Sequence, residues 1–533
     1  MPQETFSGVT ATPTKRIGRD CLTFPNPAGD NDSGSALEVQ KNRISSPSST
    51  LPYLPAEVLV YIFSFHADEE INSSLVSTLW NVSQVCRSWR DASLGNARLW
   101  TYLSINAKDL PDWQLILQRM AGLWFTNAKS LPISFSLKCD QLHRNYVKVF
   151  SSGALDSLFP FLPHLSELQL VAVDIDILTT FFQLPRGTLS SLESLHVVTW
   201  AFELEKITST EVFCSVPLLR RAILTVGRPT KYRLAADFIF PWGQLTHLQL
   251  KNHGAIDPIA WFAVFSQCSQ LQHGIFRLGR NHVELDPFPA IPHVTFACLE
   301  TLTLECDSSL GRLEMFSFPT LRNITIIGTD DKPMDKFLES FSPHLLHSLI
   351  LVKADFSITA FLQFLGGCDI LETLCIESPW FEVFHPLRHG RSAVPPPLLP
   401  NLKLFEVCIL ASERIYFSND EENWEFMRPD KLAALLRWWY ESPSPSLRRA
   451  SLYYVYGYYH GSGRYRLEAD SHEAQIERSL AFISGLVSLL QDYLFDETIR
   501  PSGLVLTTTV LHEYHDQYRQ RHPLTYSRMN AFQ

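Results

Sequence analysis

Apolar residues recur along more than half of the chain in one fixed phrase, in which positions one, four and six are apolar. Positions four and six are two residues apart, which predicts a short strand with one buried face, and position one precedes that strand. The phrase returns at intervals of 22 to 31 residues, and of 45 residues at its last step. Among the fourth and sixth positions only Gly274 is not apolar. The phrase opens at Leu165, Leu192, Leu219, Leu245, Leu271, Leu299, Leu321, Leu346, Leu371, Leu402 and Leu447.

Between the phrases, apolar residues at helical spacing predict amphipathic return limbs. In 357–365, Ile358, Phe361, Leu362 and Leu365 are spaced i, i+3, i+4 and i+7. Similar limbs are expected at 176–183, 205–216, 256–267 and 430–440. A period of roughly 20–29 residues with this phrase is typical of leucine-rich repeats, whose coils share one core. We therefore expect an α/β fold over residues 106–452, a curved solenoid with parallel strands inside and helices outside.

The two ends of the chain differ from this repeat. Residues 1–50 are rich in Ser, Thr, Pro and Gly and are predicted to be a disordered tail. Residues 453–533 are expected to form a helical cap on the open end of the solenoid. Within the cap, Leu511–His515 resembles a metal-binding helix, but its histidines are three residues apart, and we interpret it as a solvated helix face.

Composition limits the possible partners and compartments. The formal net charge of -10 gives no basic footprint for nucleic acid. The 10 cysteines are scattered without a CxxC pair, which is typical of reduced intracellular thiols. Those near the strands, Cys268, Cys298, Cys306, Cys368 and Cys375, are expected in the packed core. No apolar run approaches the ~18 residues of a membrane span, and no secretory core follows Met1. We expect a cytoplasmic or nuclear protein without a membrane partner.

A different unit, residues 51–105, precedes the repeat. Its first helix, 54–63, starts with Pro55 in the first turn and carries an apolar stripe. A second helix is expected around 77–92, and an alternating segment, 101–105, predicts a strand. About fifty residues form a marginal core, so we expect a partner, the solenoid, or both to complete it.

The residues of this unit resemble the F-box family in three segments. These are Leu54-Pro55-x-Glu57-Val58-Leu59-x-x-Ile62-Phe63, then Val82-Ser-Gln-Val85-Cys86-Arg87-Ser88-Trp89-Arg90, then Leu99-Trp100. The stretch between the helices, 64–78, departs from the family because it is longer and lacks an Asp-rich turn. With the repeats, the chain is similar to F-box proteins of the leucine-rich-repeat type, many of them fungal.

The resemblance implies docking on the Skp adaptor of a Skp–cullin–F-box ubiquitin ligase, with a substrate held on the repeat domain. The implied adaptor-binding residues are Leu54, Pro55, Val58, Leu59, Ile62, Phe63, Val82, Val85, Cys86, Trp89 and Trp100. Helix-in-groove docking on such anchors is a known recognition mode. The alternative for each residue is that it belongs to the core of the unit itself.

A substrate site is expected on the strand face opposite the buried leucines. Residues second from the anchors place Arg221, His247 and His273 in one row, because neighbouring strands lie roughly 4.8 Å apart. Lys251 and Arg277 are expected to flank that row. Such a basic patch suits an acidic or phosphorylated peptide, although exposed strands also carry charges only for solubility.

The sequence offers no motif for catalysis of its own. It has neither a phosphate-binding GxxxxGK[ST] loop nor a GxSxG elbow. No metal, cofactor or catalytic residue is therefore expected, and partners would carry out any ubiquitin transfer. The alternative function is a leucine-rich-repeat interaction scaffold that does not act in a ligase.

Overall fold

The computed structural model describes the chain between residues 54 and 514, with gaps. The described residues are 54–64, 78–107, 113–139, 155–172, 175–199, 211–226, 240–252, 263–278, 293–306, 315–328, 335–352, 356, 358–377, 399–411, 447–458, 488 and 505–514. The expected disordered tail at 1–50, the limb at 430–440 and most of the expected cap lie outside these residues.

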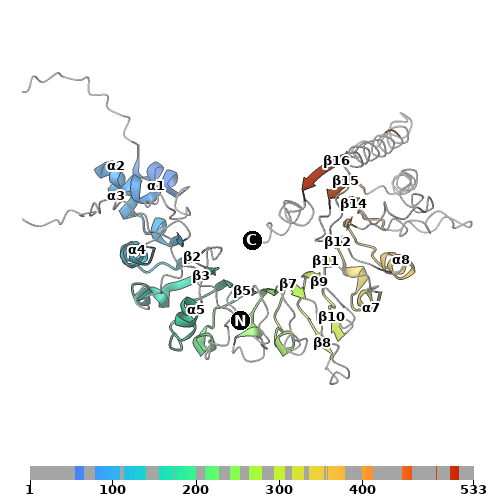
Figure 1. The fold of residues 1–533 in the computed structure, drawn as a ribbon, viewed down its shortest axis with the longest axis horizontal. Coiled ribbons are helices and arrows are strands. Elements are labelled where there is room, and N and C mark those ends of the chain that lie inside the picture. The colour runs from blue at the N-terminus through green and yellow to red at the C-terminus, as the bar shows by residue number, and fades with distance from the viewer. Residues whose placement is uncertain are drawn as a thin grey trace, which may run out of the picture. The chain divides into compact units, whose positions relative to one another are not determined.

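Within the described residues, fourteen strands form one sheet, and every neighbouring pair is parallel. Each strand pairs with the next of the sheet in chain order (Figure 1). The strands are β1 Tyr102–Asn106, β2 Ile133–Lys138, β3 Leu165–Val171, β4 Ser194–Thr199, β5 Arg221–Val226, β6 His247–Asn252, β7 His273–Leu278, β9 Thr301–Cys306, β11 Asn323–Gly328, β12 Ser348–Val352, β13 Thr373–Glu377, β14 Leu404–Ala411, β15 Arg449–Tyr458 and β16 Val505–Tyr514. The mixed α/β class and the parallel sheet agree with the expectation from the repeat.

The repeated phrase produces the same local structure in successive coils. The anchor N–H donates to the carbonyl three residues earlier, as from Leu192 to Leu189 at 3.1 Å, and this turn leads into the strand. The fourth and sixth positions then face the core, where most of them are buried and Leu224 and Leu250 are half-buried, and β4 alternates strictly between half-buried and buried residues. At the exception, Gly274, an added Cβ would lie 2.6 Å from the Phe276 ring. That ring therefore leaves no room for a side chain at position 274.

The return limbs are less helical than the sequence predicts. Helices α5 Ile175–Phe182 and α8 Ile358–Gly366 confirm two expected limbs. In the described part of 205–216 the chain forms only a short 3-10 helix, Glu211–Ser215. In 256–267 a single helical turn is described, at 263–265.

Two limbs contain no α-helix in their described parts. Strands β8 Val294–Thr295 and β10 Phe316–Ser317 pair with each other there, outside the large sheet. Aromatic packing takes the place of a helix, because the ring of Phe318 stacks at 5.5 Å on Phe296 and at 5.5 Å on Phe341. The remaining short elements are α7 Asp335–Leu338 and the 3-10 helices Phe159–His164, Trp242–Gln244 and Pro343–Leu345.

The cysteines that precede strand anchors pack as expected in two coils. Cys268 and Cys368 are buried, and each thiol donates to the carbonyl four residues earlier at 3.3 Å. Burial raises the pKa of both thiols to about 12. Cys375 is buried too, whereas Cys298 is exposed, so its expected place in the core is wrong. The side chain of Cys306 is not described.

The C-terminal part contains strands where a helical cap was expected, although Ser488 is helical. Strand β15 runs beyond the expected end of the repeat at 452, and β16 pairs with it in parallel. Leu511–Tyr514 therefore lie in a strand, and the predicted helix face is wrong. Long-range pairing to β15 supplies hydrogen bonds that a local pattern does not reveal. Among the described helices, none is long and apolar enough to cross a bilayer.

The first helices and the sheet share one core. Helices α1 Ala56–Ser64, α2 Thr78–Val85, α3 Arg87–Gly95, the 3-10 helix Ala97–Trp100 and α4 Trp113–Ala128 lead into β1 and β2. Leu59, Phe63 and Trp100 belong to the same hydrophobic cluster as the strand leucines. The sheet thus completes the small core of the first unit, and β1 lies across the expected boundary at 105.

Candidate functional site

Helix α1 is apolar on two faces, and only one of them is buried. Leu59 is 1% exposed and Phe63 is fully buried, with its ring 5.3 Å from that of Trp89. The backbone N–H groups of Val58 and Leu59 both donate to the carbonyl of Pro55 at 3.1 Å, so Pro55 closes the first turn. These contacts fix the rotation of the helix about its axis.

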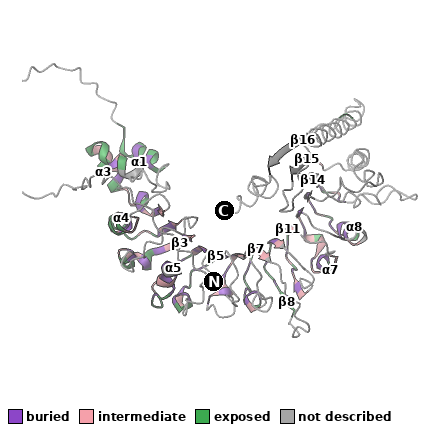
Figure 2. Ribbon diagram, in the orientation of Figure 1, coloured by how far each residue is buried: buried purple, intermediate pink, exposed green. Residues whose placement is uncertain are grey.

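The other face of α1 carries an apolar stripe. Val58 is 41% exposed and Ile62 39%, and their i, i+4 spacing places them along one side of the helix, while Leu54, 40% exposed, lies two residues before its start. Tyr61, three residues after Val58, is 67% exposed beside them. Figure 2 shows exposed residues along α1 and α3. We call Leu54, Val58, Tyr61 and Ile62 the α1 stripe.

The second predicted helix is in fact two helices. Cys86 is extended, with φ −158° and ψ 172°, and separates α2 from α3. The expected single apolar stripe is therefore divided: Val82 and Trp89 are half-buried against the core, whereas Val85 and Cys86 are exposed, Val85 at 61%. Arg90 bridges the break, because its Nε donates to the carbonyl of Ser83 at 3.0 Å.

Trp100 is a core residue. It is fully buried, its Nε1 donates to the Ser93 carbonyl at 2.8 Å, and its ring lies 4.8 Å from Trp124. Trp124 in turn donates to the carbonyl of Tyr102 in β1 at 2.8 Å. Trp100 therefore joins the helical unit to the sheet.

The structure thus separates the expected adaptor-binding residues into two sets. Leu54, Pro55, Val58, Ile62, Val85 and Cys86 are exposed, whereas Leu59, Phe63 and Trp100 are interior and Val82 and Trp89 are half-buried. Sequence reasoning missed Tyr61 and Leu94, the latter 40% exposed on α3. Tyr61 could have been found, because it lies one helical turn from Val58.

The open face of the sheet is the second candidate surface, and its register follows the sequence prediction. Arg221 pairs with His247 and His247 with His273, while Lys251 pairs with Arg277. The rings of His247 and His273 stack with centroids 4.4 Å apart. Burial lowers the pKa of His247 to about 4, with His273 and Arg221 as lesser causes, and burial also lowers the pKa of His273. Both imidazoles are therefore neutral near pH 7.

The expected basic patch is divided into two parts. The residues of the two rows are separated by four positions along each strand, about 13 Å between backbone positions, so the rows offer two separate places for an anionic group. In the second row, Glu305 on β9 accepts from Lys251 at 3.1 Å and lies 3.9 Å from Arg277. Glu305 thereby offsets part of the positive charge. Glu305 is the register partner of Arg277, but its shorter contact is with Lys251, which lies two strands away on β6.

A polar chain crosses the first strands of the open face and was not predicted. Ser136 donates to Gln169 Oε1 at 2.9 Å, and Gln169 Nε2 lies 2.9 Å from His196 Nδ1. Burial, and secondarily Lys138, lowers the pKa of His196 to about 4. This chain satisfies polar groups in the middle of the sheet.

On later strands the same face becomes apolar. Ile350, Val352 and Cys375 are buried and pack with Ile327 in a cluster separate from the main core. Val352 lies on the open face, as the alternation of the repeated phrase predicts, but neighbouring side chains bury it.

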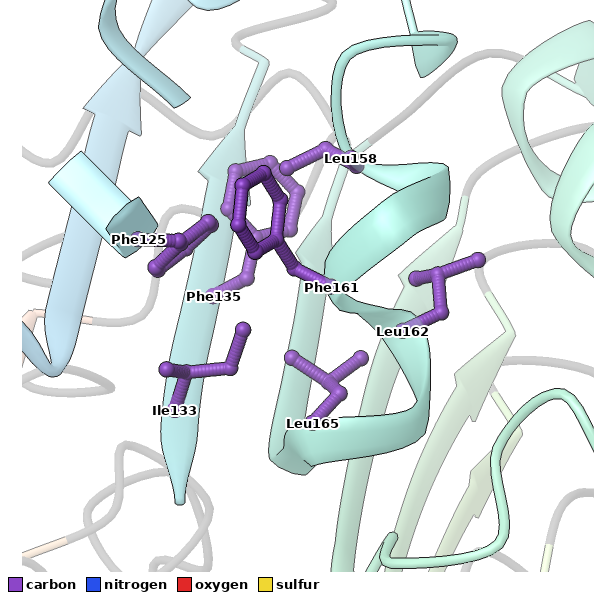
Figure 3. Close-up of a pocket in the computed structure, with 7 residues that line it drawn as sticks. All are labelled: Phe125, Ile133, Phe135, Leu158, Phe161, Leu162 and Leu165. Carbon is purple, nitrogen blue, oxygen red and sulfur yellow. The ribbon is translucent and has the colours of Figure 1, made fainter. Parts of the chain in front are cut away.

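The described cavity next to the first repeat strands has no binding chemistry. About 10 Å³ is enclosed by Phe125, Ile133, Phe135, Leu158, Phe161, Leu162 and Leu165 (Figure 3). That space is at the lower limit for one water molecule, and the apolar lining offers it no hydrogen bond. Among the described residues, no three His, Cys, Asp or Glu side chains are grouped to hold a metal ion.

Comparison with known proteins identifies the helical unit. A family model described as F-box-like matches residues 51–106, which cover α1, α2, α3 and β1. No curated protein matches the chain. The match supports an F-box protein: residues 51–106 form an F-box-like domain, of the kind through which F-box proteins bind the Skp adaptor.

Proposed function

We propose that the protein is a substrate-recognition subunit of a Skp–cullin–F-box ubiquitin ligase. The observation that carries the proposal is the α1 stripe, an exposed apolar row on a helix whose opposite face is buried. Contiguous exposed apolar residues typically mark a protein-binding surface, and they lie within the F-box-like match. The Skp adaptor would cover Leu54, Val58 and Ile62, with Val85 and Cys86 on the neighbouring helix end.

In this proposal the interior residues support the surface. Leu59, Phe63 and Trp100 hold α1 against α3 and the sheet, while Val82 and Trp89 pack beside them. Their substitution would disturb adaptor binding only through the fold.

The second half of the proposal concerns the sheet. We infer that the parallel strands and their limbs are a leucine-rich-repeat solenoid, because the repeated phrase returns with one strand and one entering turn per coil. A protein substrate would bind on its open face, at Arg221, His247, Lys251, His273 and Arg277. Partner subunits would supply ubiquitin transfer, in the cytoplasm or nucleus.

Affinity purification of the tagged full-length protein with mass spectrometry tests the proposal. We expect a Skp adaptor and a cullin in the wild-type sample, and neither in the Val58→Asp/Ile62→Asp variant. Point substitutions are preferable to deleting 51–105, because that deletion would remove most of β1 and six buried side chains of the shared core: Leu59, Phe63, Leu99, Trp100, Leu103 and Ile105. Recovery of the repeat domain's other partners without any adaptor would favour a scaffold outside the ligase.

A further inference from the structure

We propose that the open face of β5, β6, β7 and β9 is a two-point site for an extended peptide with two anionic groups four residues apart. This inference rests on the proposed function, in which this face holds a substrate. Its basis is the spacing of the fixed positive charges, which the strand register determines.

The first point is at Arg221. Arg221 is exposed and begins the row that continues through the stacked pair His247 and His273. The negative charge of Glu300 raises the pKa of His273 and so offsets part of the lowering by burial. The imidazoles can contribute hydrogen bonds, and Arg221 contributes the charge.

The second point is at Lys251 and Arg277. The side chain of Lys251 is 22% exposed and that of Arg277 is 27% exposed. Both form ion pairs with Glu305, whose side chain is 15% exposed. With Glu305 in place, these three side chains still carry one net positive charge. A carboxylate or phosphate from a ligand can approach Lys251 and compete with Glu305 for it.

The floor between the two points is uncharged. Ile223, Gln249 and Ile275 are half-buried and form the paired middle row of the same face. An extended peptide can cross this floor and use Gln249 for a backbone hydrogen bond. The two points attract anionic side chains, and the uncharged floor between them can accommodate a neutral peptide backbone.

The distance between the points selects the spacing in the ligand. Four residues of strand span about 13 Å, and an extended ligand covers the same distance in four residues. Side chains at i and i+4 of an extended chain project to the same side, whereas those at i and i+3 project to opposite sides. A pair at i and i+2 spans only about 7 Å. The site therefore distinguishes peptides that carry equal total charge.

Fluorescence anisotropy with labelled peptides tests this inference on the full-length protein. The probes share one Ala/Ser/Gly sequence and carry two glutamates, or two phosphoserines, at i,i+2, i,i+3 or i,i+4. We expect the i,i+4 peptides to bind about tenfold more tightly than the i,i+3 peptides, the effect of losing one charge-assisted contact. The comparison of the two arms shows whether carboxylate or phosphate is preferred.

Three variants connect the preference to the residues. Arg221→Gln should remove the preference for i,i+4, and Glu305→Gln should strengthen binding of every doubly charged peptide. Arg220→Gln is the matched control, since Arg220 is an exposed arginine one position before the strand row, and should leave the preference unchanged. Equal affinity for all spacings, or no binding of any probe by the folded protein, would overturn the inference. Adaptor co-purification is measured on the same samples, so failure of the ligase proposal is seen separately.

Discussion

Replacing Val58 and Ile62 by aspartate tests whether the α1 stripe is a docking surface. Both side chains are about two-fifths exposed, 41% and 39%, so a partner can still remove that area from water. Full burial of such a side chain contributes about 1.5–3 kcal/mol, so the remaining area of the pair is worth about 1–2.5 kcal/mol. Two aspartates forfeit this and must also be desolvated, which costs several kcal/mol more.

We expect the affinity for a purified Skp adaptor to fall by more than about a hundredfold, as measured by isothermal titration calorimetry. The unfolding temperature should fall, because about three-fifths of each side chain is already buried in the free protein, but a circular-dichroism spectrum should show that the variant is folded at 25 °C. Leu115→Asp/Leu123→Asp is the matched control: these leucines on α4 are 46% and 40% exposed and lie outside the F-box-like match. The control should bind like wild type. Wild-type affinity in the folded α1 variant would refute the reasoning.

The neighbouring leucine shows why the choice of residue matters. Leu59 is 1% exposed and packs in the core. Leu59→Ala is expected to lower the free energy of unfolding by about 2–5 kcal/mol. A charge at this position would unfold the unit, and a loss of adaptor binding would then say nothing about docking.

Three further predictions concern the packing of single residues. Gly274→Leu should lower the free energy of unfolding by about 1–3 kcal/mol, measured by urea denaturation, because the new side chain displaces the Phe276 ring; an unchanged midpoint would contradict this. Cys86 should react with iodoacetamide in the folded protein at pH 8 while Cys268, whose pKa is raised to about 12, stays unmodified until denaturant is added; equal labelling would contradict its burial. Because the pKa of His196 falls from 6.5 to about 4 on folding, the unfolded state binds more protons between these values, and stability should fall as pH decreases from 6.5 to 4; a His196→Gln variant with the same pH dependence would refute this.

The spacing of apolar residues was sufficient to predict the sheet register. Side chains alternate between two faces of a strand, so a phrase with apolar positions four and six assigns each intervening residue to the open face. The pairing of Arg221 with His247, and of Lys251 with Arg277, follows from this rule and is confirmed. The register did not predict the charge pattern of that face, because the ion pair between Lys251 and Glu305 depends on how the side chains are oriented.

In the helical unit, tertiary packing decided more than the local sequence did. Local sequence predicted α1, but α1 is apolar on both sides, and periodicity cannot choose which side is buried. Packing against Trp89 and the sheet buries Leu59 and Phe63, and that choice leaves Val58 and Ile62 exposed. The helix break at Cys86 has the same origin, since helical spacing continues through it in sequence.

The sequence by itself therefore determined the strands of the repeated phrase, their order and their facing, because these depend on a short repeat of two-residue alternation, whereas β2 and β16 carry no such phrase. Tertiary structure alone decided which apolar side chains remain available to a partner. Exposure is a property of the whole packed core, in which residues far apart in the chain compete for the same interior volume.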